Sequence, residues 1–396
     1  MKLLFLTPII LILPIYSYGN NIINGDNFLS NDYITNEKAE TPGIILKKTV
    51  VQDNYELKNA SKTLKVIYSS TDGITKKIRL NSGIILFPHG EKPNSGWPIL
   101  SWQHGTAGTA DVCAPSWTGP DLPSKEMINK WLGLGYAVIA ADYQGLGTEG
   151  IHPYLSTTPT AYSVLDLLNA SLRDTTLGLQ NNILLYGWSQ GAFATVATTT
   201  YVDHYAPELN IVAAAASGTP FLNKSTFKLL NTDKVNPTSA VSYVTYISNS
   251  LSLLHEDIDM DSLFKKKGLK LNQKYGNYCV EQFLKTAYKQ KITFNQVVQD
   301  NAFNSNNVLE KVGYKNFNKK IPLFLTIGEN DHDVPTDMQL ALTKKMCSEG
   351  LNLKYKLYPK ADHVQAFLES ADDTEKFFQS IQKNTQLSIA NTLNCK

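Results

Sequence analysis

The sequence contains very little arginine and no block of like charge. Its 37 basic residues balance 35 acidic residues to a net charge of +2, and only Arg79 and Arg173 are arginines. Nucleic-acid-binding proteins carry clustered basic patches, so no electrostatic footprint for a nucleic acid is present. There is also no 20–50-residue repeat and no low-complexity tract, which excludes solenoids and linker-like chains.

The composition is that of a chain with a full hydrophobic core. Of 396 residues, 42% are hydrophobic and 18% are charged, which is not the composition of a disordered chain. This length accommodates two or three domains, or one large α/β domain that carries an insertion.

Only one long apolar run is present, and it lies at the start of the sequence. Lys2 precedes the apolar residues 3–15, and the small residues Ser17 and Gly19 follow. This order is typical of a signal peptide, and the run is shorter than the roughly 20 residues that span a membrane. We therefore expect residues 1–19 to be a cleaved signal peptide. The mature protein is then exported, secreted or periplasmic, without a transmembrane anchor.

Cysteine is scarce, and its spacing does not suggest zinc. The four cysteines form no CxxC motif and no Cys/His pattern of a zinc site. An exported protein can keep two disulfides, in any of three pairings; four free thiols are the alternative. No metal or cofactor is expected. The cysteines are Cys113, Cys279, Cys347 and Cys395.

Strand-like runs alternate with amphipathic helical patterns in two parts of the chain. This alternation predicts an α/β fold with a mostly parallel sheet and helices on both faces. Residues 20–60 are polar and Asn-rich, which favours an irregular arm. The predicted strands are 64–69, 84–87, 99–102, 137–141, 183–186, 211–216, 322–327 and 353–358. The predicted helices around them are 125–133, 162–171, 193–201, 336–348 and 370–382.

The alternation stops over residues 217–320. This stretch has long helical patterns, at 239–254 and 278–289, and no clear buried strand. It predicts a helical insertion that divides one α/β core into residues 20–216 and 321–396.

The pentapeptide Gly187-Trp-Ser-Gln-Gly191 carries the chemistry. It matches G-x-S-x-G between a predicted strand and a small-residue helix, which is typical of a nucleophile elbow. Ser189 is then the nucleophile, and the N–H of Gln190 at the helix N-terminus faces a developing oxyanion. A glycine-rich turn with a satisfied serine is the alternative.

A serine nucleophile needs a base and an acid, which follow it in this fold as acid, then histidine. His363 is the candidate base because it lies in the loop between strand 353–358 and the last helix. His204 and His255 are expected to be surface residues, and His332 follows the candidate acid directly.

The candidate acid is Asp331, which lies in a G-x-x-D-x-x-V-P pattern after strand 322–327. Asp333 and Glu329 are the alternatives. The run from Asp331 through His332 to Asp333 is not expected to bind a metal, because one short loop offers too few convergent ligands.

The second oxyanion donor is expected from the loop after strand 99–102. The loop reads Gln103-His-Gly-Thr-Ala-Gly108, and its glycines allow close approach of the backbone to a substrate oxygen. Thr106 is the candidate, through its backbone N–H, and Ala107 is the alternative. His104 is expected to be structural.

These motifs resemble the α/β-hydrolase superfamily. Three segments resemble, more specifically, the secretory lipases related to fungal lipase A and their bacterial relatives. They are His104-Gly-Thr-Ala-Gly-Thr-Ala-Asp-Val-Cys-Ala-Pro-Ser116, the pair Asp142-Tyr-Gln-Gly-Leu-Gly147 and His152-Pro-Tyr-Leu155, and the helix after Ser189.

The resemblance implies a triad of Ser189, Asp331 and His363, and a helical cap over the acyl pocket. It also implies the disulfides Cys113–Cys279 and Cys347–Cys395, and a structural role for Asp142.

Together the motifs predict an exported serine ester hydrolase, a lipase or carboxylesterase, that acts on acyl esters or lipids. A serine peptidase or acyltransferase of the same fold and a silent binding protein are the alternatives. The cap is expected to touch lipid surfaces transiently. Its apolar residues either line an acyl tunnel or form its own core: Phe221, Phe227, Leu229, Leu230, Tyr243, Tyr246, Leu251, Leu253 and Leu254.

Overall fold

The computed structural model describes residues 29–232, 235–254, 258–275, 278–303, 309, 312–314, 316–385 and 392–395. The expected signal peptide, at residues 1–19, and His255 lie outside these ranges. Within them, no helix combines the length and the apolar character that crossing a membrane requires.

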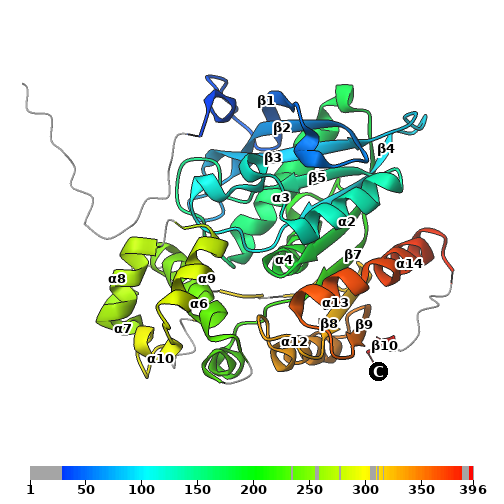
Figure 1. The fold of residues 1–396 in the computed structure, drawn as a ribbon. Helices are drawn as coiled ribbons and strands as arrows, with labels where there is room; N and C mark the ends of the chain where they lie inside the picture. The colour runs from blue at the N-terminus through cyan, green and yellow to red at the C-terminus, as the bar shows by residue number, and fades with distance from the viewer. Residues whose placement is uncertain are drawn as a thin grey trace, which may run out of the picture.

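The strands in the described ranges form one sheet, ordered β1-β2-β3-β5-β4-β6-β7-β8-β9-β10 (Figure 1). Neighbours from β5 to β9 run parallel, and the strands at both edges are antiparallel. The expected mostly parallel α/β sheet is confirmed. The bounds are β1 Ile44–Val51, β2 Ala60–Thr71, β3 Ile78–Pro88, β4 Trp97–Gln103, β5 Ala137–Ala141, β6 Leu179–Trp188, β7 Ile211–Ser217, β8 Leu323–Gly328, β9 Leu353–Tyr358 and β10 Leu393–Asn394.

The expectation of an irregular arm over residues 20–60 was wrong for β1. This strand pairs antiparallel with β2, with Ile44 opposite Ser69 and Val51 opposite Thr63. It lies at the edge of the sheet and none of its residues is fully buried. An edge strand needs few apolar residues, so its hydrophobic pattern is weak.

Helices cover both faces of the sheet because successive side chains of a strand point to opposite sides. Ile183 and Leu185 join one core layer, whereas Leu184 joins the other. The first layer contains α3 (Thr157–Arg173), α4 (Gln190–Tyr205) and α12 (Thr336–Ser348). The second contains α2 (Leu122–Gly133), α13 (His363–Glu369) and α14 (Ala371–Gln382).

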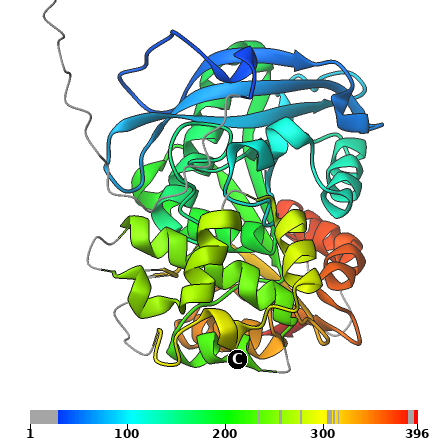
Figure 2. The same ribbon diagram turned by 60° about the vertical axis from the view of Figure 1, so that its left-hand side comes forward.

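A group of helices is inserted in the chain between β7 and β8, and these two strands still pair with each other in the sheet (Figure 2). We call residues 224–297 the helical segment. Part of its apolar content forms its own core: Phe227 packs on Phe294, and Tyr246 packs on Phe283. The helices are α5 Lys224–Phe227, α6 Pro237–Leu254, α7 Met260–Leu263, α8 Lys266–Tyr275, α9 Val280–Lys289 and α10 Phe294–Val297.

The four cysteines form two disulfides, Cys113–Cys279 and Cys347–Cys395. These are the pairs that the resemblance implies. The first joins the chain after β4 to the start of α9, and the N–H of Val280 also donates to the carbonyl of Ala107 over 2.9 Å. The loop after β4 is therefore fastened to the helical segment by a covalent bond and a hydrogen bond.

Candidate active site

Ser189 stands on a strained turn at the carboxyl end of β6. Its backbone has φ 59° and ψ −119°, and α4 begins at the next residue. Few residues other than glycine adopt a positive φ, and such strain clusters at functional sites. The N–H of Ser189 donates to the carbonyl of Ser217 over 2.9 Å. The turn has the geometry of a nucleophile elbow.

Only glycine fits on the two sides of this turn. A Cβ at Gly187 would lie 2.1 Å from the carbonyl oxygen of Gly191. A Cβ at Gly191 would lie 1.8 Å from the carbonyl oxygen of Gln103. The elbow is therefore packed against the end of β4 without room for a side chain.

His363 and Asp331 form a buried pair, although Asp331 lies in the turn after β8 and His363 is the first residue of α13 rather than a loop residue as expected. His363 Nδ1 lies 2.7 Å from Asp331 Oδ2. The other carboxylate oxygen, Oδ1, accepts the N–H groups of Asp333 and Val334 over 3.0 and 2.8 Å. Gln339 Nε2 donates to Oδ2 over 2.8 Å. The carboxylate is thus held from three sides.

This pairing sets the state of the imidazole. Burial alone disfavours the imidazolium, but the nearby Asp331 carboxylate outweighs it and raises the pKa of His363. Because Nδ1–H donates to Asp331, Nε2 carries the lone pair. Nε2 is buried and has no hydrogen-bond partner in the described ranges. Ser189 and His363 line the same cavity.

The competing acids do not contact His363. Asp333 Oδ1 instead accepts the hydroxyl of Ser239 over 2.5 Å, and Glu329 is exposed. His204 and His332 are also exposed. Of the sequence candidates for acid and base, the structure brings together Asp331 and His363.

Trp188 also contacts His363. Its indole N–H donates to the backbone carbonyl of His363 over 3.3 Å, and its ring lies 5.3 Å from the imidazole. The indole also stacks on Phe367, with centroids 5.1 Å apart. The sequence does not predict this role, because Trp188 occupies a variable position of the G-x-S-x-G pattern.

Gln190 follows the nucleophile and begins α4, so its backbone N–H has no intrahelical acceptor. Its side-chain Nε2 lies 2.8 Å from His152 Nε2. His152 Nδ1 lies 2.8 Å from the carbonyl of Gln144, which can only accept. Nδ1 therefore carries the proton and Nε2 accepts from Gln190. Burial lowers the pKa of His152 to about 4, so the ring is neutral at working pH.

The loop after β4 lies beside this turn, and Thr106 lines the cavity that contains Ser189. Thr106 Oγ1 is 2.7 Å from the hydroxyl of Tyr154. Both His152 and Tyr154 belong to the His-Pro-Tyr-Leu segment, so that segment contacts both expected oxyanion residues. The sequence predicts no role for the side chain of Gln339, and Tyr154 is marked only by its place in the His152–Leu155 segment that carries the resemblance.

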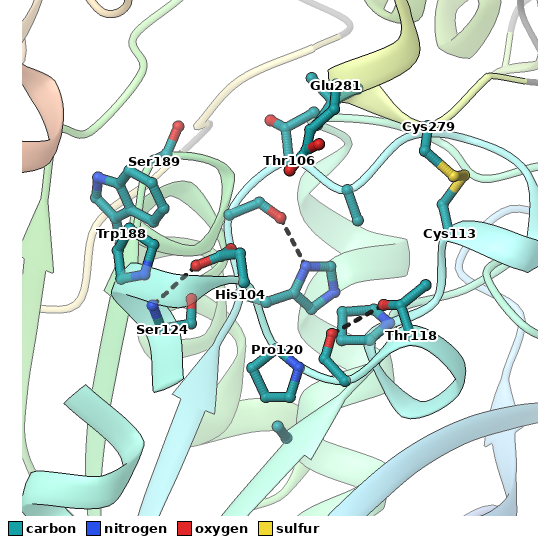
Figure 3. Close-up of a pocket in the computed structure, with 18 of the residues that line it drawn as sticks. His104, Thr106, Cys113, Thr118, Pro120, Ser124, Trp188, Ser189, Cys279 and Glu281 are labelled. Carbon is teal, nitrogen blue, oxygen red and sulfur yellow. Dashed lines mark hydrogen bonds between the residues drawn. A yellow bond between two sulfur atoms is a disulfide. The ribbon is translucent and has the colours of Figure 1, made fainter. Parts of the chain in front are cut away.

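His104 and Asp142 make the contacts of structural residues. The ring of His104 stacks on Tyr143, and its Nδ1 lies 2.7 Å from the carbonyl of Gly105, drawn as a dashed line in Figure 3. The Asp142 carboxylate accepts the hydroxyl of Ser82 over 2.6 Å and the N–H of Ser116 over 2.8 Å. These bonds tie the middle of β3, the end of β5 and the chain after Cys113 together.

Two cavities meet at Ser189. The larger, of about 600 Å³, lies between Thr106, Trp188 and the Cys279–Glu281 stretch (Figure 3). The smaller, of about 30 Å³, is mostly apolar. Among the apolar residues expected over 217–320, Leu230 and Tyr243 line the smaller cavity. Its other apolar walls are Leu155, Leu222, Ile247, Val334 and Met338.

Comparison with known proteins gives consistent matches. Residues 124–379 match the family described as secretory lipase. Lipase A of Moesziomyces aphidis is 31% identical over 300 residues, which cover 69% of this chain and 63% of that protein. The chain thus spans less than two thirds of the length of this relative.

Solved structures resemble the whole fold. The X-ray structure of Candida antarctica lipase A in its closed state matches with a TM-score of 0.72 and 26% identity, over 93% of this chain and 88% of that one. A rice cell wall degrading esterase from Xanthomonas oryzae matches with a TM-score of 0.68, over 87% and 98%. Its identity is 18%, so this second match shows the α/β-hydrolase fold alone.

Proposed function

Because the chain belongs to the secretory lipase family, we propose that it hydrolyses carboxylic esters through Ser189, His363 and Asp331. One observation carries the proposal. The buried Asp331–His363 pair leaves Nε2 without a partner in the described ranges, in the cavity that also contains Ser189 on its strained turn.

The acylation step follows from these positions. Ser189 Oγ attacks the ester carbonyl carbon, and its proton passes to His363 Nε2. The carbonyl electron pair moves to oxygen and forms the oxyanion. Asp331 stabilises the imidazolium that forms, because its carboxylate raises the pKa of His363. When the tetrahedral intermediate collapses, His363 returns the proton to the leaving alcohol.

The oxyanion is bound by backbone N–H groups. Gln190 donates from the N-terminus of α4, and Thr106 donates from the loop after β4. Water then attacks the acyl-enzyme, again with His363 as base, and releases the carboxylic acid. None of these steps uses a metal or a cofactor.

Two cavities suit the two parts of an ester. The small apolar cavity takes the first carbons of the acyl chain, and the larger, open cavity takes the alcohol. Residues 217–320 act as a cap, since Leu222, Leu230 and Tyr243 wall the small cavity. The substrate class is therefore acyl esters, with the acyl length set by the cap.

The protein is exported. Its family is secretory, and two disulfides fit an oxidising compartment. We also infer transient contact with lipid surfaces beside the larger cavity. Leu122 precedes the cavity-lining residues Pro123 and Ser124, and Tyr288 lies one helical turn beyond Leu284. Leu122 and Tyr288 are each 76% exposed.

The test is hydrolysis of p-nitrophenyl esters, from acetate through butyrate and octanoate to palmitate. The assay uses protein that begins at residue 20, and the S189A variant is the control. Activity that S189A abolishes supports the proposal, and the preferred acyl length separates lipase from carboxylesterase. Activity that persists in S189A would overturn the assignment of the nucleophile.

A fluorophosphonate probe separates the remaining alternatives, because it labels only an activated serine. Labelling of Ser189 without ester hydrolysis would contradict the ester proposal and favour a peptidase or an acyltransferase. Absence of both labelling and hydrolysis would favour a silent binding protein.

A further inference from the structure

The hydroxyl of Tyr154 has one recorded partner. The side chain is buried, and burial raises its pKa, so the hydroxyl keeps its proton. Its oxygen lies 2.7 Å from Thr106 Oγ1, and the described ranges record no second partner for it. Buried hydroxyls donate their proton to an acceptor. Either hydroxyl could donate by geometry alone, and because Tyr154 has no other acceptor in the part of the chain that the structure describes, we assign Tyr154 as the donor and Thr106 Oγ1 as the acceptor.

This direction leaves the proton of Thr106 available for a ligand. Thr106 is half-buried, and it lines the same cavity as Ser189. Its hydroxyl accepts from Tyr154 and has no recorded acceptor of its own in the described ranges. A hydroxyl polarised in this way is a stronger donor than an isolated one.

The loop that carries Thr106 is packed directly against the elbow. A Cβ at Gly105 would lie 3.2 Å from the indole of Trp188 and 3.6 Å from its carbonyl oxygen. A Cβ at Gly191 would overlap the carbonyl of Gln103. Trp188 and Gly191, on the two sides of Ser189, thus lie against the chain just before Thr106, which lines the same cavity as Ser189.

The segment from His152 to Tyr154 contacts both proposed oxyanion residues, Gln190 and Thr106. His152 accepts from the side chain of Gln190, and Tyr154, two residues later, donates to Thr106. The N–H of Tyr154 in turn donates to the carbonyl of His152 over 2.9 Å. The two proposed oxyanion residues are therefore set at a fixed separation by one short turn.

We propose that the hydroxyl of Thr106, oriented by Tyr154, donates a hydrogen bond to the oxyanion in addition to the backbone N–H groups. This inference rests on the proposed function and identifies a side-chain donor for it. As Ser189 Oγ bonds to the carbonyl carbon, negative charge collects on the carbonyl oxygen, and the Thr106 O–H donates a hydrogen bond to that oxygen. The proton stays on Thr106 throughout.

The experiment measures phosphonylation of Ser189 by a p-nitrophenyl alkylphosphonate. Ser189 Oγ attacks phosphorus, p-nitrophenolate leaves, and the phosphoryl oxygen takes the place of the oxyanion. The second-order rate constant is followed by the release of p-nitrophenolate. Since this reaction does not require ester turnover, it tests the donor separately from the ester hydrolase proposal.

Thr106→Val, which replaces the hydroxyl with a methyl group, should lower the rate about 10²-fold, the usual loss for one oxyanion donor. Thr106→Ser keeps the hydroxyl and should restore most of the rate. Tyr154→Phe should cause a smaller loss than Thr106→Val. The double variant should react no more slowly than Thr106→Val alone, because the two hydroxyls act through one bond.

Tyr68→Phe is the matched control. It removes another buried tyrosine hydroxyl, which donates to the carbonyl of Ser163 over 2.8 Å and does not line the cavity. It should lower the melting temperature and leave the phosphonylation rate unchanged. A rate for folded Thr106→Val within about threefold of the unaltered protein would overturn the proposal, because an oxyanion donor contributes far more.

If Thr106→Val does not fold, the rates of Thr106→Ser and Tyr154→Phe are used instead. Equal phosphonylation rates in Tyr154→Phe and Tyr68→Phe would then overturn the proposal. Normal phosphonylation of the unaltered protein without any ester hydrolysis would contradict the ester substrate and leave the donor measurement intact.

Discussion

Trp188 and His363 are joined by a hydrogen bond from the indole N–H to the backbone carbonyl, over 3.3 Å, although 175 residues separate them in sequence. The residue before the proposed nucleophile therefore fixes the residue proposed as its base. The same indole stacks on Phe367, one helical turn further along α13. The elbow and the start of α13 form one unit.

Trp188→Phe should lower kcat by roughly two- to tenfold, because it removes a bond that contributes ~0.5–1.5 kcal/mol and keeps an aromatic ring on Phe367. Trp188→Ala should lower kcat further, since the ring contact is lost as well. Steady-state kinetics and thermal unfolding check both. Trp117→Phe, at a more exposed tryptophan that contacts Tyr33, should leave kcat unchanged. Equal kcat in Trp188→Phe and Trp117→Phe would show that the indole N–H does not position His363.

The pKa of His363 predicts the pH dependence of activity. Only the neutral imidazole can accept the proton of Ser189, so kcat/KM should fall as the pH drops through the pKa of His363. Because Asp331 raises this pKa, the midpoint should lie above the usual 6.5. Asp331→Asn removes the charge and leaves burial, which lowers the pKa. The midpoint should then move to lower pH, while the plateau falls by roughly 10³–10⁴-fold.

Asp333→Asn is the matched control for this experiment. Asp333 lies two residues away and also lines the cavity, but its carboxylate accepts from Ser239 instead of His363. Its variant should shift the midpoint only slightly and keep most of the activity. The acid would be wrongly assigned if Asp333→Asn produced the larger loss in the pH–rate profile.

The Cys113–Cys279 disulfide should affect activity more than the Cys347–Cys395 disulfide. Replacing either pair by serine should cost about 2–4 kcal/mol of unfolding free energy, measured by denaturant titration. Only the first pair fastens the loop of Thr106 to α9, beside the bond from Val280 to Ala107. Its loss should therefore also lower kcat/KM on short esters. Equal activities of the two double variants would contradict this coupling.

Local patterns made part of this site predictable. The elbow is encoded within a few residues, because G-x-S-x-G needs only a strand before it and a helix after it. The order of acid and histidine after Ser189 predicted the pair Asp331 and His363, which the structure joins by a hydrogen bond. The alternation of strands and helices predicted the sheet, because buried parallel strands are continuous apolar runs.

The remaining features depend on contacts between distant residues. Gln339 and Tyr154 reach the site only once α12 and the loop before α3 are packed. β1 is an edge strand. It is formed by pairing with β2, and its own side chains show no clear strand pattern. α13 was not expected, since it is short and starts at His363 itself; a capping box between Asp362 and Gln365 begins it.

Leu222 should set the upper limit on acyl chain length. It lines the small cavity beside Ser189 and also a third cavity, of about 850 Å³, next to Lys224 and Lys345. Leu222→Ala should connect these two cavities. Each further methylene that is buried contributes ~0.8 kcal/mol, so two of them should raise kcat/KM for longer esters relative to butyrate by roughly tenfold.

The comparison that tests this limit is Leu251→Ala. Leu251, in α6, is buried like Leu222 but lines neither cavity. Both variants should lose about 2–5 kcal/mol of stability, the usual cost of truncating a buried leucine. Only Leu222→Ala should change the ratio of kcat/KM for octanoate to that for butyrate. An unchanged ratio in folded Leu222→Ala would mean that the acyl chain does not enter the small cavity, and the larger cavity would then hold it instead.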